Sequence, residues 1–438
     1  MLLKRARRPR KPKVYRIPLE TYVVTLAIAS AFAVAMSLMG RPKEVHYLLP
    51  HRFSVEDEAF LPSAHALADP SMLSGNRARV LVNGQEIFPA MLAAISRAQR
   101  SINLESYIFW SGSIANKFRD ALIDRSRHGV QVRLILDSVG SKSKLKDPDI
   151  AALRQAGCFL ELYHPLRPWN LNSFDNRTHR RILVVDGKIG FTGGAGIADE
   201  WLGNADSKNH WRDTQVQVEG PVVAQLQATF QENWSEVRGE ALLGEDFYPR
   251  LEPVGKSLSQ VIHSTSRAPS SATKLLYAVS IASAAKRLYL SNSYFLPDKE
   301  TSAALVNAAR RGVDVEVIVP GEVNDVPATK AGGRSAFGVL LRGGVKIFEY
   351  QPTMFHPKTM VVDGVFSTIG STNFDNRSFR KNDEINLTLA DPVVGSRMEA
   401  LFKDDLTHSR PYTLEDYQRR SMKDRIFEWA VRPFRAEL

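Results

Sequence analysis

One stretch of the sequence, HPKTMVVDGVFSTIGSTN, begins at His356, ends at Asn373 and combines residues suited to chemistry on phosphorus. Side chains alternate along a strand, so His356 and Lys358 are expected to point to the same side. An imidazole can attack or exchange a proton there, while the ammonium group neutralises phosphoryl oxygens. Ser371 and Asn373 add hydrogen-bond donors. A lone His-x-Lys pair is usually a chance match on a half-buried strand, but this many matching residue types at fixed spacing favour a catalytic site.

A second stretch upstream, HRRILVVDGKIGFTGGAG, begins at His179 and repeats the pattern in altered form. Arg181 occupies the position of the lysine, and Gly196 occupies the position of the final asparagine. An arginine can still bind phosphate, often through two hydrogen bonds, although its planar fork is not a geometric replacement for an ammonium group. The upstream copy therefore keeps the imidazole and a cation but lacks the hydrogen-bond donor of the asparagine.

The downstream copy resembles the His-x-Lys-x4-Asp-x6-Gly-Ser-x-Asn signature of the phospholipase D superfamily, whose members normally carry two copies that form one site. Four further segments point within that superfamily to bacterial cardiolipin synthases: INLESY at 102–107, YFLPD at 294–298, FEY at 348–350 and NFDNRSF at 373–379. The resemblance implies a membrane phosphatidyltransferase that acts on phosphatidylglycerol or a related phospholipid. It also implies that the reaction needs no cofactor and no metal.

The same resemblance implies roles for the site residues. One histidine attacks the lipid phosphorus and becomes phosphohistidine, while the other protonates the leaving alcohol; we assign the nucleophile to His179 and the acid and base to His356. An acidic residue beyond each motif holds a catalytic imidazole, and Asp213 and Glu384 occupy the matching positions. The candidate catalytic residues are His179, His356, Lys358, Arg181, Asp186, Asp363, Asp213 and Glu384, and the candidate phosphate-binding residues are Lys358, Arg181, Ser371, Asn373 and Gly194.

Asp186 and Asp363 belong to the motifs, yet their positions also have a structural explanation. Each precedes a glycine at an expected hairpin turn, where Asp-Gly is favoured for its backbone conformation. We interpret both as mainly structural. The alternative, that they anchor the opposite half's histidine or a neighbouring loop, stays open at the level of sequence.

Three other functions share some of these features. A phospholipase D-type phosphodiesterase would use water as the acceptor, and a nuclease of the superfamily would be favoured by a basic groove. Of the formal net charge of +11, eight positive charges lie in residues 1–16, so the rest of the chain carries only +3 and nucleic acid is not an expected partner. A non-catalytic membrane scaffold would explain Arg181 and Gly196, but the intact histidine pair argues against it.

The chain contains an internal duplication. The expected elements of a β-α-β unit occur twice: strands 102–109 and 130–136 around helix 114–127, and strands 288–295 and 313–319 around helix 301–311. The pair Ser106-Tyr107 recurs as Ser293-Tyr294. The repeat is too long for a solenoid and predicts an α/β fold of two homologous phospholipase D-like halves, each a mixed β-sheet flanked by helices.

Residues 22–40 form a run of nineteen residues without a charge. A helix of this length spans about 28 Å, close to the roughly 30 Å of hydrocarbon in a bilayer. Because eight basic residues precede the run and few follow it, the positive-inside bias places the N-terminus in the cytoplasm. We therefore expect one transmembrane helix in a bacterial inner membrane, with the catalytic region on the periplasmic face. A cleavable signal peptide or a buried core helix is the alternative.

The expected segments are a basic tail (1–21), a transmembrane helix (22–40), a linker (41–74), two phospholipase D-like halves (75–250 and 251–406) and a C-terminal tail (407–438). Within that tail, residues 417–434 mix arginines with large hydrophobic residues. An interfacial amphipathic helix and a helix packed on the catalytic core explain this composition equally well. The single cysteine, Cys158, excludes an intrachain disulfide, and the oligomeric state is not predicted.

Overall fold

A computed structural model of the protein describes residues 51, 54–57, 60, 71–165, 176–265 and 272–431. The chain divides into two compact units, Met1–His46 and Tyr47–Leu438, and every described residue belongs to the second. The basic tail and the predicted transmembrane run at 22–40 lie outside the described residues. Within the described ranges, no helix has the length and apolar character needed to cross a membrane.

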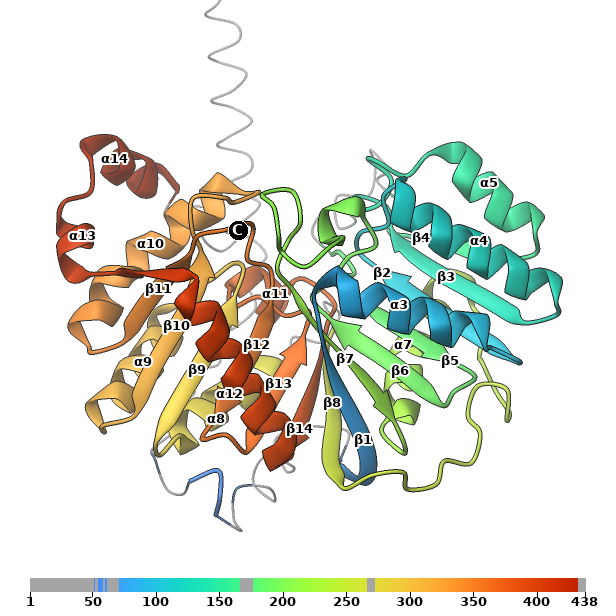
Figure 1. Ribbon diagram of the computed structural model, residues 1–438, viewed down its shortest axis with the longest axis horizontal. Coiled ribbons are helices and arrows are strands. Elements are labelled where there is room, and N and C mark those ends of the chain that lie inside the picture. The colour runs from blue at the N-terminus through green and yellow to red at the C-terminus, as the bar shows by residue number, and fades with distance from the viewer. Residues whose placement is uncertain are drawn as a thin grey trace, which may run out of the picture. The chain divides into compact units, whose positions relative to one another are not determined.

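Fifteen strands of the described chain form one mixed sheet in the order β15-β11-β10-β9-β12-β13-β14-β8-β1-β7-β6-β5-β2-β3-β4 (Figure 1). Outward from the β1–β8 join, β7-β6-β5-β2-β3-β4 on one side corresponds to β14-β13-β12-β9-β10-β11 on the other, and β15 is an additional edge strand. The strands are β1 Leu73–Val82, β2 Ser101–Ser106, β3 Gln131–Asp137, β4 Phe159–Tyr163, β5 Ile182–Val185, β6 Ile189–Gly193, β7 Thr214–Glu219, β8 Ser257–Ser264, β9 Arg287–Asn292, β10 Asp314–Pro320, β11 Lys346–Tyr350, β12 Lys358–Val362, β13 Phe366–Gly370, β14 Glu384–Ala390 and β15 Ser409–Tyr412.

Helices cover both faces of the sheet. In Figure 1, α3 and α4 lie in front of the first half and α12 lies in front of the second. The described helices are α3 Asn83–Ser96, α4 Ser113–Arg127, α5 Asp147–Gln155, the 3₁₀ turn η1 Asp199–Trp201, α7 Val223–Arg238, α8 Ala272–Ser283, α9 Lys299–Arg310, α10 Pro327–Arg342, α11 Asn376–Arg380, α12 Pro392–Thr407, α13 Leu414–Gln418 and α14 Met422–Val431. The expected α/β fold with a mixed sheet is confirmed, although the two halves contribute to one continuous sheet.

The predicted β-α-β units have the expected parallel pairing. Strands β2 and β3 pair in parallel around α4, and β9 and β10 pair in parallel around α9. The antiparallel hairpins β5–β6 and β12–β13 pack against β2 and β9, respectively. Each motif histidine lies just before such a hairpin, so the duplicated β-sheet positions both histidines in equivalent places.

Three hydrophobic clusters form the core. One packs α3, α4 and α5 on the first half of the sheet, and a second packs α8, α9 and α10 on the second half. The third lies under α7 and α12 and contains Phe230 and Trp234 together with Met398 and Phe402, so it is shared by both halves. Because burial of this shared apolar surface stabilises the fold, the halves are packed together rather than tethered.

Two boundaries differ from those expected from the sequence. Strand β1 begins at Leu73, inside the range 41–74 that we interpreted as a linker, and Phe60 from that range is fully buried against Phe366. Strand β15, inside the range interpreted as a C-terminal tail, pairs with β11 and closes the edge of the sheet. Only the first two residues of β1 fall in the linker range, and β15 has four residues, so the sequence pattern at both places is too short to separate a strand from a connection.

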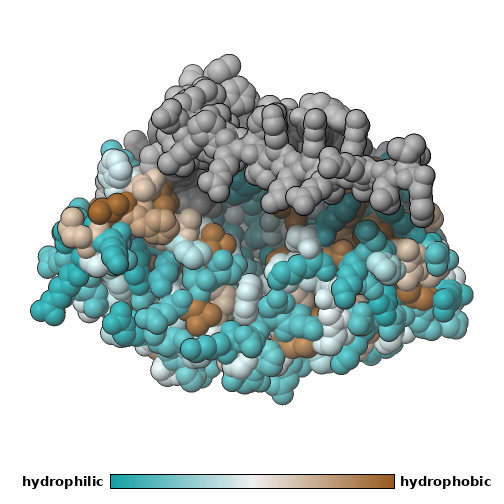
Figure 2. All heavy atoms as spheres, turned by 90° about the horizontal axis from the view of Figure 1, so that it is seen from above, coloured by the Kyte–Doolittle hydropathy of each residue, from teal (hydrophilic) through white to brown (hydrophobic). Residues whose placement is uncertain are grey.

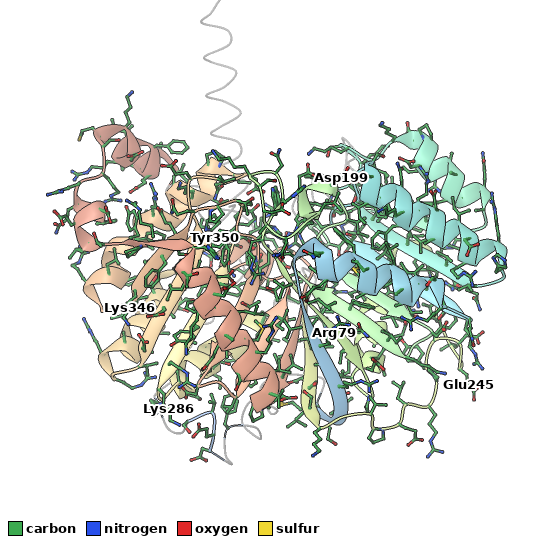
Figure 3. The ribbon with its side chains drawn as sticks, viewed as in Figure 1. Arg79, Asp199, Glu245, Lys286, Lys346 and Tyr350 are labelled. Atoms are coloured by element: carbon green, nitrogen blue, oxygen red, sulfur yellow. The ribbon has the colours of Figure 1, made fainter. Side chains whose placement is uncertain are left out.

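The two motif aspartates hold the ends of the hairpins. Asp186 and Asp363 both adopt a left-handed backbone conformation, with φ of 53°, and each is followed by a glycine with positive φ. The Asp363 carboxylate accepts hydrogen bonds of 2.8–2.9 Å from the backbone N–H groups of Ala285, Lys286 and Arg287. Asp186 accepts from the equivalent three N–H groups, those of Gln99, Arg100 and Ser101, at the start of β2. Lys286, whose N–H group binds Asp363, lies at the lower end of the sheet in Figure 3. The contacts of Asp363 therefore fix the end of a hairpin, which is a structural role.

We predict that Asp363→Ala lowers the free energy of unfolding by about 3 kcal/mol, because three amides lose a charged acceptor. Asp363→Asn keeps one carbonyl oxygen and tolerates the left-handed conformation, so we expect a smaller loss. Urea unfolding of the two variants and the wild type measures the difference. If Asp363→Ala were as stable as the wild type but had lost its turnover, Asp363 would instead have a catalytic role.

Candidate active site

Each motif histidine is held by backbone of the opposite half. The N–H group of His179 donates to the carbonyl of Asp383 over 2.8 Å, and that of His356 donates to the carbonyl of Arg212 over 2.8 Å. These contacts belong to two short parallel bridges, Thr178–Asp383 and Arg212–Phe355. The two histidine motifs therefore meet at the junction of the halves, as expected for a single composite site.

The imidazoles form crossed pairs with the two predicted carboxylates. His179 Nδ1 lies 3.0 Å from Glu384 of the second half, and His356 Nδ1 lies 2.7 Å from Asp213 of the first half. All four side chains are buried. A carboxylate on Nδ1 fixes the ring tautomer and orientation and leaves Nε2 for the reaction. The sequence indicated both carboxylates, but it gave no sign that each one serves the histidine of the other half.

The serine of the downstream motif holds Glu384. Ser371 Oγ donates to the Glu384 carboxylate and accepts from the N–H group of Ile385. Ser378 Oγ donates to the other Glu384 oxygen over 2.8 Å. We expected Ser371 to bind substrate phosphate, and in this geometry its hydroxyl hydrogen is directed to the carboxylate instead.

The corresponding position in the first half, Gly194, lies against the carboxylate of Asp213. A Cβ atom on Gly194 would lie 2.2 Å from Asp213 Oδ1, so the absent side chain leaves room for the carboxylate. Asp213 then receives hydrogen bonds from Trp201 Nε1 at 2.8 Å and from the N–H group of Thr214 at 2.7 Å. Gly194 thus permits the close approach of the acid that supports His356.

The two motif cations occupy equivalent places beside the histidines. Lys358 Nζ lies 2.9 Å from His356 Nε2 and donates to the His356 carbonyl over 2.8 Å. One terminal nitrogen of Arg181 lies 3.3 Å from His179 Nε2, and the other donates to the His179 carbonyl over 2.9 Å. The arginine therefore replaces the lysine in position as well as in sequence, and its Nε has no hydrogen-bond partner among the described residues.

The asparagine position also differs between the halves for a steric reason. Asn373 Oδ1 accepts a 2.9 Å hydrogen bond from Ser293 Oγ, and the same hydroxyl accepts a 2.7 Å hydrogen bond from Lys358. At Gly196, a Cβ atom would lie 2.9 Å from Ile108 and 3.2 Å from Trp201. The first half has no room for an asparagine here, so its departure from the motif reflects local packing.

Burial and the two cations keep the imidazoles neutral. Burial is the largest cause that lowers the pKa of His179, to about 4, and Arg181 adds to it while Glu384 opposes it. The pKa of His356 is lowered to about 3 by burial and by Lys358, against the effect of Asp213. Lys358 also lowers the pKa of His179, and Arg181 that of His356, so the charges of both halves act on both rings.

Sequence reasoning missed a buried polar network beneath His179. Asp383, the neighbour of Glu384 in the sequence, is fully buried and accepts a 2.6 Å hydrogen bond from Tyr163. Asn233 bridges Asp383 and Glu105, at 3.3 and 2.7 Å. The role of Ser293 was also missed, although its recurrence in the repeated Ser-Tyr pair was the available signal. The other residues come from distant segments, so no local pattern could have indicated them.

These features, two homologous halves with crossed imidazole–carboxylate pairs at their junction, define the phospholipase D class of proteins. The chain belongs to the phospholipase D-like cardiolipin synthase family, because residues 91–234 and 277–406 match the family described as "Cardiolipin synthase, PLD-like domain". The resemblance predicted from the motifs is confirmed. The chain is therefore an enzyme of the cardiolipin synthase type, a class of phosphatidyltransferases.

Similar proteins support this assignment over most of the chain. The probable cardiolipin synthase YwiE of Bacillus subtilis is 33% identical over 379 residues, which cover 86% of this chain and 75% of that protein. Cardiolipin synthase A of Pseudomonas putida is 35% identical over 384 residues, covering 87% of this chain and 79% of that protein. The structure of phosphatidylserine synthase from Haemophilus influenzae aligns with a TM-score of 0.63 over 86% of this chain and 97% of that one. At 12% identity, this last likeness shows the fold alone.

We predict that Arg181→Ala lowers turnover by roughly 10²–10³, the loss seen when one electrostatic donor to a transition state is removed. Arg181→Lys should recover much of the activity, because the second half uses a lysine in the same place. Initial rates with a labelled phospholipid measure this series. Equal activity of the three forms would mean that Arg181 does not contact the reacting phosphate.

Proposed function

We propose that the enzyme transfers the phosphatidyl group of one phosphatidylglycerol to a second, which gives cardiolipin and glycerol through a phosphohistidine intermediate. The observation that carries this proposal is the pair of buried imidazoles, each with a carboxylate on Nδ1 and a cation beside Nε2. One phosphorus between two such rings meets a nucleophile on one side and a proton donor on the other.

In the first step, Nε2 of the nucleophilic imidazole attacks the lipid phosphorus. The P–O bond to the glycerol headgroup breaks, and the leaving oxygen takes a proton from the second imidazole. Lys358 and Arg181 neutralise the charge on the phosphoryl oxygens as it develops. Asp213 and Glu384 stabilise whichever ring carries positive charge, since each accepts from Nδ1.

In the second step, a hydroxyl group of another phosphatidylglycerol attacks the phosphorus of the intermediate. Its proton passes to the second imidazole, the P–N bond breaks, and the nucleophilic ring is regenerated. The covalent intermediate divides one difficult displacement into two, and both steps use the same two rings. Transfer then competes with hydrolysis according to which hydroxyl the site positions and how well it excludes water.

We also propose that residues 22–40 anchor the enzyme in a bacterial inner membrane and that the two halves, 75–250 and 251–406, act on its periplasmic side. The uncharged run and the basic residues before it support this topology. A membrane anchor would concentrate both lipid substrates at the site.

Helix α14 supports contact of the catalytic unit with a lipid surface. Val431 and Glu428 of this helix are buried, whereas Met422, Ile426 and Trp429, spaced for one helical face, are 67%, 59% and 70% exposed. Figure 2 looks down on this side and shows hydrophobic atoms toward the left, where α14 lies in Figure 1. A helix with such a face and basic neighbours is suited to the headgroup region of a bilayer. The packed and the interfacial interpretations of this segment are thus compatible.

We predict that purified enzyme converts labelled phosphatidylglycerol into cardiolipin and glycerol, with little phosphatidate, in the presence of a chelator. Thin-layer chromatography of the labelled lipids after incubation measures the products. His179→Ala and His356→Ala should each abolish turnover, because one imidazole cannot serve both roles at the phosphorus.

Other outcomes would change the assignment. Phosphatidate as the main product in vesicles rich in phosphatidylglycerol would establish a hydrolase. Degradation of single-stranded DNA without any lipid product would establish a nuclease. Near-normal activity of either histidine variant would contradict the composite site.

The topology gives a separate prediction. A reporter enzyme that matures only outside the cytoplasm should be active when it is fused after Leu438, because the basic residues before the membrane run are retained inside. The same reporter fused before Lys4 should be inactive and serves as the control. Activity only in the second fusion would reverse the orientation.

A further inference from the structure

A small cavity that is open to solvent lies in the second half next to the catalytic centre, and Ser293 is among its lining residues. It opens at the ends of β9 and β10 and is closed on one side by the first turns of α10. Its apolar wall includes Phe295 and Phe337, and its polar wall contains Ser293, Asn324, Thr329, Lys330, Arg334 and Glu349. The cavity is small and combines apolar surface with several polar side chains that could orient a small polar group.

Lys330 gives the cavity wall a positive charge, on which the carboxylates of Glu349, Glu322 and Asp424 act from a distance. Its Nζ donates to the carbonyl of Gly321 over 2.6 Å, and it forms no ion pair among the described residues. The nearby carboxylate of Glu349 is already paired with Arg334 and lies 3.6 Å from Arg410. Burial is the largest cause that lowers the pKa of Lys330. A partly buried ammonium group with free N–H donors is suited to an anion such as phosphate.

Ser293 connects this cavity to the chemistry. The serine lines the cavity, and its hydroxyl accepts a 2.7 Å hydrogen bond from Lys358 Nζ, which lies 2.9 Å from His356 Nε2. The side chains of Ser293 and Lys358 therefore connect the cavity to Nε2 of His356. It lies on the side of His356 rather than of His179.

The acceptor of the proposed reaction has its own phosphate. In phosphatidylglycerol, three carbons of the headgroup separate the attacking hydroxyl from a phosphodiester that carries one negative charge. Catalysis needs one phosphate between the two histidines, so the acceptor phosphate requires a second, separate cation. Lys358 and Arg181 serve the first phosphate, and Lys330 is available for the second.

We propose that the cavity around Lys330 binds the phosphate of the acceptor phospholipid and directs its headgroup hydroxyl to the site. This inference rests on the proposed function and names the subsite that favours transfer over hydrolysis. It also assigns the histidines. In an in-line displacement, the alcohol oxygen that leaves or attacks lies on the side of the phosphorus opposite the nucleophilic histidine. An acceptor that enters beside His356 therefore makes His356 the acid and base, and His179 the nucleophile.

The experiment compares two acceptors with the full chain reconstituted in phosphatidylglycerol vesicles. Cardiolipin formation uses an acceptor with a phosphate, whereas exchange of labelled free glycerol into phosphatidylglycerol uses an acceptor without one. We expect Lys330→Gln to lower the cardiolipin rate about tenfold or more, the effect of losing one charged hydrogen bond, and to increase phosphatidate. Glycerol exchange should remain within about twofold, which also shows that the variant is folded.

Two further variants sharpen the test. Lys330→Arg keeps the charge and should restore much of the cardiolipin rate. Lys346→Gln removes an exposed cation of the same half, labelled in Figure 3, which pairs with Asp314 and Glu316, and should change neither reaction. The proposal is overturned if Lys330→Gln leaves both reactions unchanged or lowers both by the same factor. Wild-type enzyme that exchanges glycerol but forms no cardiolipin would instead refute the proposed function.

Discussion

The site depends on two buried imidazole–carboxylate hydrogen bonds that cross between the halves. His179 is paired with Glu384, His356 with Asp213, and all four groups are buried. Removing one partner leaves the other buried without its hydrogen bond, which typically costs about 1–3 kcal/mol and more when the remaining group is the carboxylate. Each half therefore contains an imidazole that it cannot orient alone. The sheet join at β1–β8 and the core cluster shared by α7 and α12 keep the halves in register, so the fold and the site require the same interface.

The duplicated halves reach similar imidazole positions with different residues. On one side, the shorter Asp213 approaches closely because Gly194 has no side chain, while on the other side the longer Glu384 is fixed by the hydroxyl of Ser371. Arg181 and Lys358 contact their histidines at the same two points. These differences would be hard to explain if both halves performed the same task. They are consistent with one ring that bonds to phosphorus and another that exchanges protons with the alcohols.

The sequence predicted the local features well and the long-range ones poorly. The Asp-Gly hairpins, the two β-α-β units and the two histidine motifs depend on nearby residues, and the structure contains each of them. The crossed pairing of the carboxylates and the burial of Asp383 depend on contacts between segments about 200 residues apart, at Glu384 with His179 and Asp383 with Tyr163. A single sequence contains no periodicity that reports such contacts. The same limit applies to β15, whose four residues become a strand because β11 offers an unpaired edge.

The lowered pKa values of the two imidazoles have a consequence for the order of events. A neutral ring is the form needed for attack on phosphorus, whereas the acid must carry a proton before the glycerol leaves. Lys358 and Arg181 oppose protonation of both rings, in addition to the effect of burial. A bound phosphodiester places a negative charge between these cations and offsets their effect, so the acid is protonated more readily once a lipid is bound. Because Asp213 stabilises the proton on His356, the substrate and the carboxylate together prepare this ring to protonate the leaving oxygen.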